Sequence, residues 1–72
     1  MASKTTQIFA KHIDKIRRDQ ELSFQEMAYR CDMPKSQVYN ICTKGVDLRI
    51  TSIIKLAKGL NVSIQEIFNF KH

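Results

Sequence analysis

The stretch that decides the fold reads Met33-Pro34-Lys35-Ser36-Gln37-Val38-Tyr39-Asn40-Ile41-Cys42. Pro34 fixes a backbone angle that suits the first turn of a helix and prevents a preceding helix from continuing. In a helix, Val38 and Ile41 share a buried face, and the polar side chains share the outer face. These polar residues are Lys35, Ser36, Tyr39 and Asn40. Their functional groups are suited to hydrogen bonds with base edges and phosphates, although an ordinary solvated face would look similar.

The residues before this stretch predict a short helix with a well-defined start. Ser23 can accept a hydrogen bond from the amide of Glu26, whose carboxylate can reach back to the amide of Ser23, which is a capping box. Leu22 and Met27 supply a hydrophobic staple around it. The inward residues of this helix are Phe24, Met27, Ala28 and Cys31. Asp32 and Met33 then form a brief connection to the next helix.

The flanking sequence predicts three further helices. From Thr6 to about Asp19, Phe9, Ile13 and Ile16 recur at helical spacing. The remaining surface of this helix is strongly basic, with Lys11, His12, Lys15, Arg17 and Arg18. The decisive stretch should end near Thr43, where Gly45 relieves the backbone. A helix from Ile50 should follow and end at Gly59 in a left-handed conformation, and its expected inward residues are Ile50, Ile53, Ile54 and Ala57.

The last predicted helix repeats the start signals of the second. Val62-Ser63-Ile64-Gln65-Glu66-Ile67 matches Leu22-Ser23-Phe24-Gln25-Glu26-Met27 in its staple, its cap and its capping box. Residues 1–72 are therefore predicted to form a single all-α domain, a compact five-helix bundle. Its apolar carboxyl-terminal residues suit a dimer contact. They are Ile64, Ile67, Phe68 and Phe70.

Size, charge and cysteine usage narrow the functional classes. A chain of 72 residues is long enough for one core but not for a core and a deep substrate cavity. A net charge of +5 points to a polyanionic partner. Cys31 and Cys42 stand singly in apolar positions, which favours buried reduced thiols over a zinc site. No segment suits a membrane span or a secretory signal, so we expect a cytoplasmic protein with neither metal nor cofactor.

The second and third predicted helices resemble a helix-turn-helix. Ser23 opens the first of them, the small Ala28 allows a close crossing, and Val38 fills the angle between the two helices. With the five-helix order and the run Leu56-Ala57-Lys58-Gly59-Leu60-Asn61-Val62-Ser63, the chain resembles the phage repressor and Cro type of DNA-binding domain, also called the XRE family. The resemblance extends from about Ile13 to Phe68. It implies a lambda-repressor-like fold that places the third helix in the major groove.

The resemblance also implies roles for individual residues. The residues implied to read bases are Lys35, Ser36 and Asn40, with Gln37 and Tyr39 beside them. The residues implied to meet phosphate are Ser23, Phe24 and Gln25 through the amino end of the second helix, and Lys44 and Arg49 in the loop that follows the third.

Three positions depart from the family pattern. Asp32 stands where glycine is usual, and because aspartate tolerates a left-handed backbone better than most residues, the left-handed turn is still expected there. Phe24 stands where a phosphate-binding glutamine is frequent. Cys42 occupies the place of a glutamate that often pairs with the arginine at Arg17. Arg17 must therefore find Glu26, Asp47, a backbone carbonyl or DNA, and the sequence does not choose among them.

We interpret the chain as a homodimeric, sequence-specific regulator of transcription that binds double-stranded DNA, with repression favoured over activation. The alternative is an antitoxin-like or controller module that chiefly holds a partner protein, which the apolar carboxyl-terminal end would permit. An enzyme is not expected, because the acidic residues are scattered or used in caps and no nucleophile has an obvious base. RNA binding fits the charge, but Phe24, Tyr29 and Tyr39 do not form a stacking platform.

Overall fold

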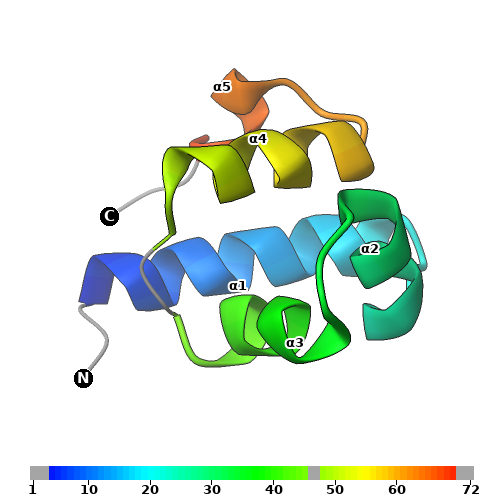
Figure 1. Ribbon diagram of the computed structural model, residues 1–72. Helices are drawn as coiled ribbons and strands as arrows, with labels where there is room; N and C mark the ends of the chain where they lie inside the picture. Colours follow the sequence, from blue (N-terminus) through cyan, green and yellow to red (C-terminus); the bar gives the residue numbers. More distant parts are fainter. Residues whose placement is uncertain (1–3, 46–47, 70–72) are drawn as a thin grey trace.

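The computed structural model describes residues 4–45 and 48–69, which form helices and connecting turns without a strand (Figure 1). The helices are α1 (Lys4–Asp19), α2 (Phe24–Cys31), α3 (Lys35–Thr43), α4 (Ile50–Gly59) and α5 (Ile64–Ile67). This order confirms the prediction of an all-α bundle of five helices. Pro34 is the residue before α3, and its extended backbone (φ −62°, ψ 145°) leads into the helix.

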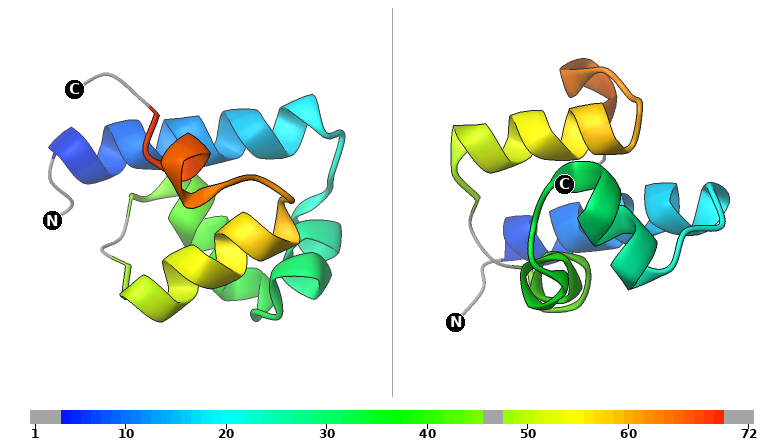
Figure 2. Two further views of the ribbon diagram at one scale, coloured as in Figure 1. Left: turned by 90° about the horizontal axis from the view of Figure 1, so that it is seen from above. Right: turned by 45° about the vertical axis from the view of Figure 1, so that its right-hand side comes forward.

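The helices are arranged so that α3 and α5 lie on opposite sides of the molecule. In Figure 1, α3 lies below α1, whereas α4 and α5 lie above it, and the right-hand view of Figure 2 keeps this order. Helix α2 stands at one end and packs on both α3 and α4. The surface of α3 is therefore separated from the surface of α5 by the body of the domain.

One hydrophobic core draws residues from all five helices. Burial of these side chains removes apolar surface from water and is the main favourable contribution to folding. The largest fully buried side chains are Ile13, Met27, Cys31, Val38, Ile41, Leu56, Leu60 and Ile67.

Three helices end in the same way, with a left-handed residue that is not glycine. These residues are Glu21, Asp32 and Asn61, with φ of 57°, 55° and 56°. In each case the next amide donates to a carbonyl five residues earlier, as in Met33 N–H to Ala28 O at 3.0 Å. The expected left-handed turn at Asp32 is confirmed.

Gly59 differs from its prediction, because the left-handed residue after α4 is Asn61. Gly59 is needed for close packing instead. A Cβ atom at Gly59 would lie 2.7 Å from the Cα of Cys31 and would also meet its Sγ. The absence of a side chain at Gly59 therefore lets α4 approach the end of α2.

The inward face of α4 also differs from its prediction. Ile50 is 74% exposed and Ile54 is 37% exposed, whereas Leu56 and Ala57 are buried and Ile53 packs against the core. The buried stripe follows Ile53, Leu56, Ala57 and Leu60, at intervals of three and four residues. Ile54 falls outside that stripe, and Ile50 stands at the amino end of the helix, beyond the core.

Candidate nucleic-acid interface

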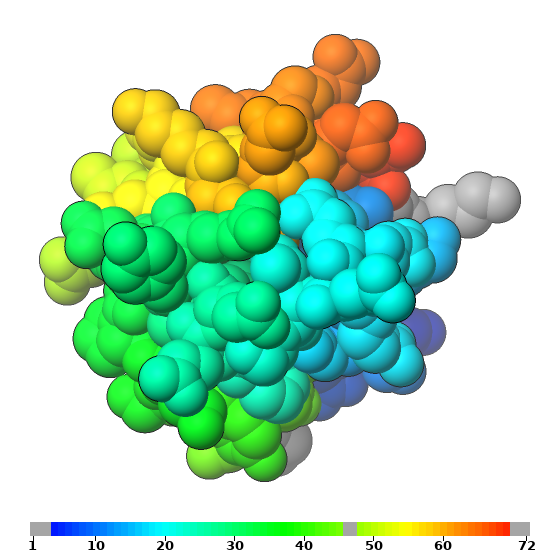
Figure 3. Space-filling view, turned by 90° about the vertical axis from the view of Figure 1, so that its right-hand side faces the viewer, coloured from blue at the N-terminus to red at the C-terminus, as the bar shows by residue number. Residues whose placement is uncertain are grey.

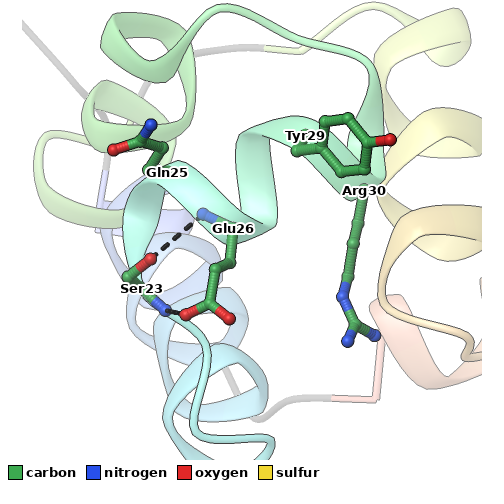
Figure 4. Close-up of a pocket in the computed structure, with 5 residues that line it drawn as sticks. All are labelled: Ser23, Gln25, Glu26, Tyr29 and Arg30. Atoms are coloured by element: carbon green, nitrogen blue, oxygen red, sulfur yellow. Dashed lines mark hydrogen bonds between the residues drawn. The ribbon is translucent and has the colours of Figure 1, made fainter.

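Helices α2 and α3 form a helix-turn-helix whose first helix has a complete capping box. The Oγ of Ser23 accepts from the amide of Glu26, and Oε1 of Glu26 accepts from the amide of Ser23, both at 3.0 Å (Figure 4). The Ser23 amide, and then its hydroxyl, hold the pKa of Glu26 below its ordinary value. Ala28 and Val38 are both buried in the core. The predicted capping box is thus confirmed, and both residues predicted to lie at the helix crossing are in the core.

The outer face of α3 carries polar side chains above a buried inner face. Val38, Ile41 and Cys42 are buried, which fixes the rotation of the helix. Of the residues predicted to read bases, the exposed ones are Lys35, Ser36 and Tyr39, and the half-buried ones are Gln37 and Asn40. Because successive residues turn by about 100° in an α-helix, Gln37 and Tyr39 lie on opposite flanks of this face. Thr43, which was not among the predicted site residues, is also exposed on α3.

The residues predicted to contact phosphate are accessible to different degrees. Ser23, Gln25, Lys44 and Arg49 are exposed, and Phe24 is half-buried. The Ser23 amide already donates to the Glu26 carboxylate. The amides of Phe24 and Gln25 are therefore the ones at the start of α2 that could donate to a phosphate. Lys44 is the first residue after α3, and Arg49 is the last residue before α4.

Arg17 pairs with a residue that was not expected from the sequence. Its Nη2 lies 2.8 Å from Oδ1 of Asp14, one turn earlier in α1, and its Nη1 donates to the carbonyl of Leu22 at 2.6 Å. The backbone carbonyl was among the open alternatives, whereas Asp14 was missed. Its spacing of three residues on a predicted helix was the available signal. Glu26 is engaged with Ser23, and Asp47 lies outside the described residues.

Two aromatic contacts connect α1, α2 and α3. The guanidinium carbon of Arg17 lies over the Phe24 ring, 4.2 Å from its centroid. The Phe24 ring meets the Tyr39 ring edge to face, with centroids 5.3 Å apart and an angle of 73° between the planes. Such pairs are preferred because the edge of one ring is electropositive and the face of the other is electronegative. Tyr39 therefore leans towards the start of α2.

The two cysteines are buried free thiols, as predicted. Burial raises the pKa of both the Cys31 thiol and the Cys42 thiol to about 11. At Cys42, Asp14 adds to this shift and Arg17 opposes it. Within the described ranges, no three histidine, cysteine or acidic side chains are grouped to hold a metal ion.

The exposed surface of α2 forms a shallow groove. It has a volume of about 530 Å³ and is lined by Ser23, Gln25, Glu26, Tyr29 and Arg30. Figure 3 shows α2 in the middle of one face of the molecule, between the turn that follows α1 and the start of α3. Tyr29 is 88% exposed here and was not among the predicted site residues.

The predicted dimer residues fall into three groups. Ile64 and Phe68 are each 49% exposed, whereas Ile67 is completely buried in the core and offers no side-chain surface to a second copy. Phe70 lies outside the described residues. The Phe68 ring also contacts Phe9 of α1, with centroids 5.9 Å apart.

None of the helices in the described ranges has the length and apolar character of a membrane span.

Comparison with known proteins places this geometry in a family. The model of the Cro/C1-type helix-turn-helix DNA-binding domain matches residues 12–72. A search of the curated proteins found no match. Among solved structures, the restriction-modification controller protein C.AhdI from Aeromonas hydrophila is similar, with a TM-score of 0.87 and 21% identity over 92% of this chain and 100% of that one. The wild-type restriction-modification controller protein C.Esp1396I is also similar, with a TM-score of 0.83 and 26% identity over 92% of this chain and 86% of that one.

The family match covers most of the chain, including the whole helix-turn-helix. The solved structures share the five-helix fold over nearly their full lengths. The chain therefore belongs to the Cro/C1-type family of helix-turn-helix DNA-binding domains and is a DNA-binding regulator.

Proposed function

We propose that this protein is a sequence-specific regulator of transcription that binds double-stranded DNA as a homodimer, with α3 in the major groove. The observation that carries this proposal is the polar outer face of α3, on the second helix of a helix-turn-helix. In this motif the second helix enters the major groove and its amino-terminal residues meet base edges. Lys35 and Ser36 occupy that end of α3 and are both exposed.

Specificity and affinity come from different side chains in this proposal. Asn40 can bond adenine through two hydrogen bonds, Lys35 can donate to guanine, and Ser36 can serve either base. Lys44 and Arg49 supply positive charge beside α3 and are assigned to phosphates. Because such contacts release counterions, the affinity should fall steeply as the salt concentration rises.

The homodimer is proposed from the exposed apolar residues of α4 and α5. They are Ile50, Ile54, Ile64 and Phe68. Both helices lie on the other side of α1 from α3 in Figure 1, so pairing through them leaves α3 accessible. Two copies related by a two-fold axis would read half-sites about 10 base pairs apart.

The proposal is tested by selecting bound duplexes from a random DNA pool and then comparing Asn40→Ala with the wild-type protein. We expect a two-fold symmetric motif, and we expect Asn40→Ala to reduce discrimination at one base pair in each half-site by about 1–3 kcal/mol. Asn69→Ala, on an exposed residue after α5, is the matched control. An unchanged preference in Asn40→Ala would contradict the readout by α3. A reporter gene placed downstream of the selected motif would test the proposed repression, because activation would raise its expression instead.

A second candidate is a module whose main role is to hold a partner protein. The same exposed apolar residues on α4 and α5 favour it. Weak, salt-insensitive DNA binding together with a stoichiometric partner in the native host would support this alternative.

The similar solved structures are restriction-modification controller proteins, which supports the first proposal, a regulator of transcription. We place the protein in the cytoplasm and assign it no catalytic role.

A further inference from the structure

Tyr39 differs from the other polar residues of α3 because its ring is held by another helix. Its ring contacts the ring of Phe24, the first residue of α2. The ring remains 46% exposed, so its contact with Phe24 does not remove it from the surface. A tyrosine on a freely solvated helix face would have no such restraint.

Phe24 is itself held from the side of α1. The guanidinium of Arg17 lies over its ring, and Arg17 is fixed by Asp14 and by the Leu22 carbonyl. The Arg17 side chain is only 14% exposed, which limits the water that competes for these bonds. Phe24 is therefore packed between a fixed cation and the Tyr39 ring, and the position of Tyr39 depends on both.

This geometry points Tyr39 towards the wall of the DNA groove. In a helix-turn-helix on DNA, the second helix lies in the groove while the first crosses the phosphate backbone. A side chain of α3 that leans on the first residue of α2 is thus directed to the phosphates that α2 crosses. No such ring contact with α2 is found for Lys35, Ser36 or Asn40 among the described interactions, so this argument applies to Tyr39 alone.

We propose that Tyr39 binds a DNA phosphate through its hydroxyl and that Phe24 is the residue that positions it. This inference rests on the proposed function and changes one part of it, because Tyr39 then contributes affinity without reading sequence. A phenol O–H is a donor that a phosphate oxygen can accept. Such a bond is a neutral hydrogen bond and not an ion pair, so it should add affinity without adding to the salt dependence.

The first test is Tyr39→Phe, which removes the hydroxyl and keeps the ring. The probes are a duplex selected by the wild-type protein, its single-base variants and a mixed-sequence duplex. We expect affinity to fall roughly two- to tenfold on all of them, which is the range for one neutral hydrogen bond. The order of preference among bases and the slope of affinity against salt should stay unchanged. Tyr29→Phe removes the same hydroxyl from the exposed face of α2 and is the matched control, with no change expected.

The second test addresses Phe24. Phe24→Leu should lower affinity to the same extent as Tyr39→Phe, and adding Tyr39→Phe to it should cause little further loss, because the hydroxyl is already misplaced. Phe24→Tyr keeps the ring and should retain binding. Thermal unfolding of each variant would separate misplacement of the Tyr39 hydroxyl from loss of the fold. If Phe24→Leu does not fold, Tyr39→Phe alone still tests the phosphate contact.

The possible outcomes separate this inference from the proposed function. If the wild-type protein selects no DNA sequence, the proposed function fails. If it selects a motif but Tyr39→Phe alters the ranking of bases, or leaves affinity unchanged on every probe, the phosphate contact is overturned and the proposed function stands. Additive losses from Phe24→Leu and Tyr39→Phe would overturn the positioning role of Phe24.

Discussion

Arg17 and Asp14 form an ion pair one helical turn apart, with Nη2 and Oδ1 at 2.8 Å and both side chains mostly removed from water. Asp14 also lies 3.1 Å from Nε of Arg18, but the Arg18 side chain is 66% exposed. The two bonds should therefore differ in strength, because solvent screens the exposed pair more strongly. The Asp14–Arg17 pair replaces the charge partner that the family resemblance places at Cys42.

Asp14→Asn should destabilise the fold by about 2 kcal/mol, because it leaves a mostly buried guanidinium without its counter-charge. Arg18→Gln removes only the exposed pair and should cost less than about 0.5 kcal/mol. Urea unfolding of both variants would measure the difference. Since Arg17 also lies beside Cys42, adding Cys42→Glu to Asp14→Asn should recover part of the loss. Equal losses in Asp14→Asn and Arg18→Gln would contradict the assigned pairing.

Gly59→Ala should destabilise the protein by about 1–3 kcal/mol, the typical cost of forcing extra volume into a packed core. The added Cβ would lie 2.7 Å from the Cα of Cys31 and 2.8 Å from its backbone nitrogen, so α4 and α2 would have to separate. Cys31→Ala should fail to restore the lost stability, because the close atoms include backbone. Lys58→Ala, on the exposed neighbour, is the control for thermal unfolding. Full rescue by Cys31→Ala would show that only the thiol blocks the added methyl group.

The helix starts could be predicted because their determinants are local. Ser23 and Ser63 each accept from the amide three residues later, so both serine caps are confirmed. The reciprocal bond of the predicted capping box is found among the described residues for Glu26 and not for Glu66. Pro34 likewise marks the start of α3 through its own backbone geometry. Asp32 could be placed in a left-handed turn because the helix-turn-helix pattern requires one at that position.

Other features depend on how distant segments meet, and the sequence did not determine them. Ile53 and Ile54 are adjacent and equally apolar, so the pattern alone could not show that Ile54 turns outwards. Gly59 fits either a left-handed turn or a close helix crossing, and only the approach of Cys31 distinguishes the two. The contact between Phe24 and Tyr39 joins residues of different helices, and its ring geometry required the structure. The assignment of individual DNA contacts remains a prediction.

Ile64→Lys should weaken the proposed dimer at least tenfold, because it places a charge in an apolar contact between two copies. Ile64 is the better position to test than Phe68, since Phe68 also packs on Phe9 within the chain. Ile50→Lys, at the 74% exposed residue of α4, should show whether the contact extends to that helix. Sedimentation at several concentrations would measure the effect, with Gln65→Lys as the control on the exposed surface of α5. Unchanged association of Ile64→Lys would exclude this surface as the dimer contact.

The two cysteines should make stability sensitive to alkaline pH. Burial raises the pKa of both thiols from the ordinary value of 9.0 to about 11 in the folded protein. The folded state thus holds its thiol protons more tightly than the unfolded state, so this contribution to stability is complete below pH 9 and is lost as pH rises towards 11.

A variant with Cys31→Ala and Cys42→Ala should start from a lower free energy of unfolding, because two buried side chains are shortened. Its stability should nevertheless decline less than that of the wild-type protein between pH 9 and pH 11. Urea unfolding at several pH values would compare the two slopes. Parallel slopes would mean that the thiols do not titrate differently in the folded and unfolded states. Alkylation of the wild-type thiols at pH 8 should likewise be slow until urea unfolds the chain, since the reactive thiolate is both scarce and enclosed in the core.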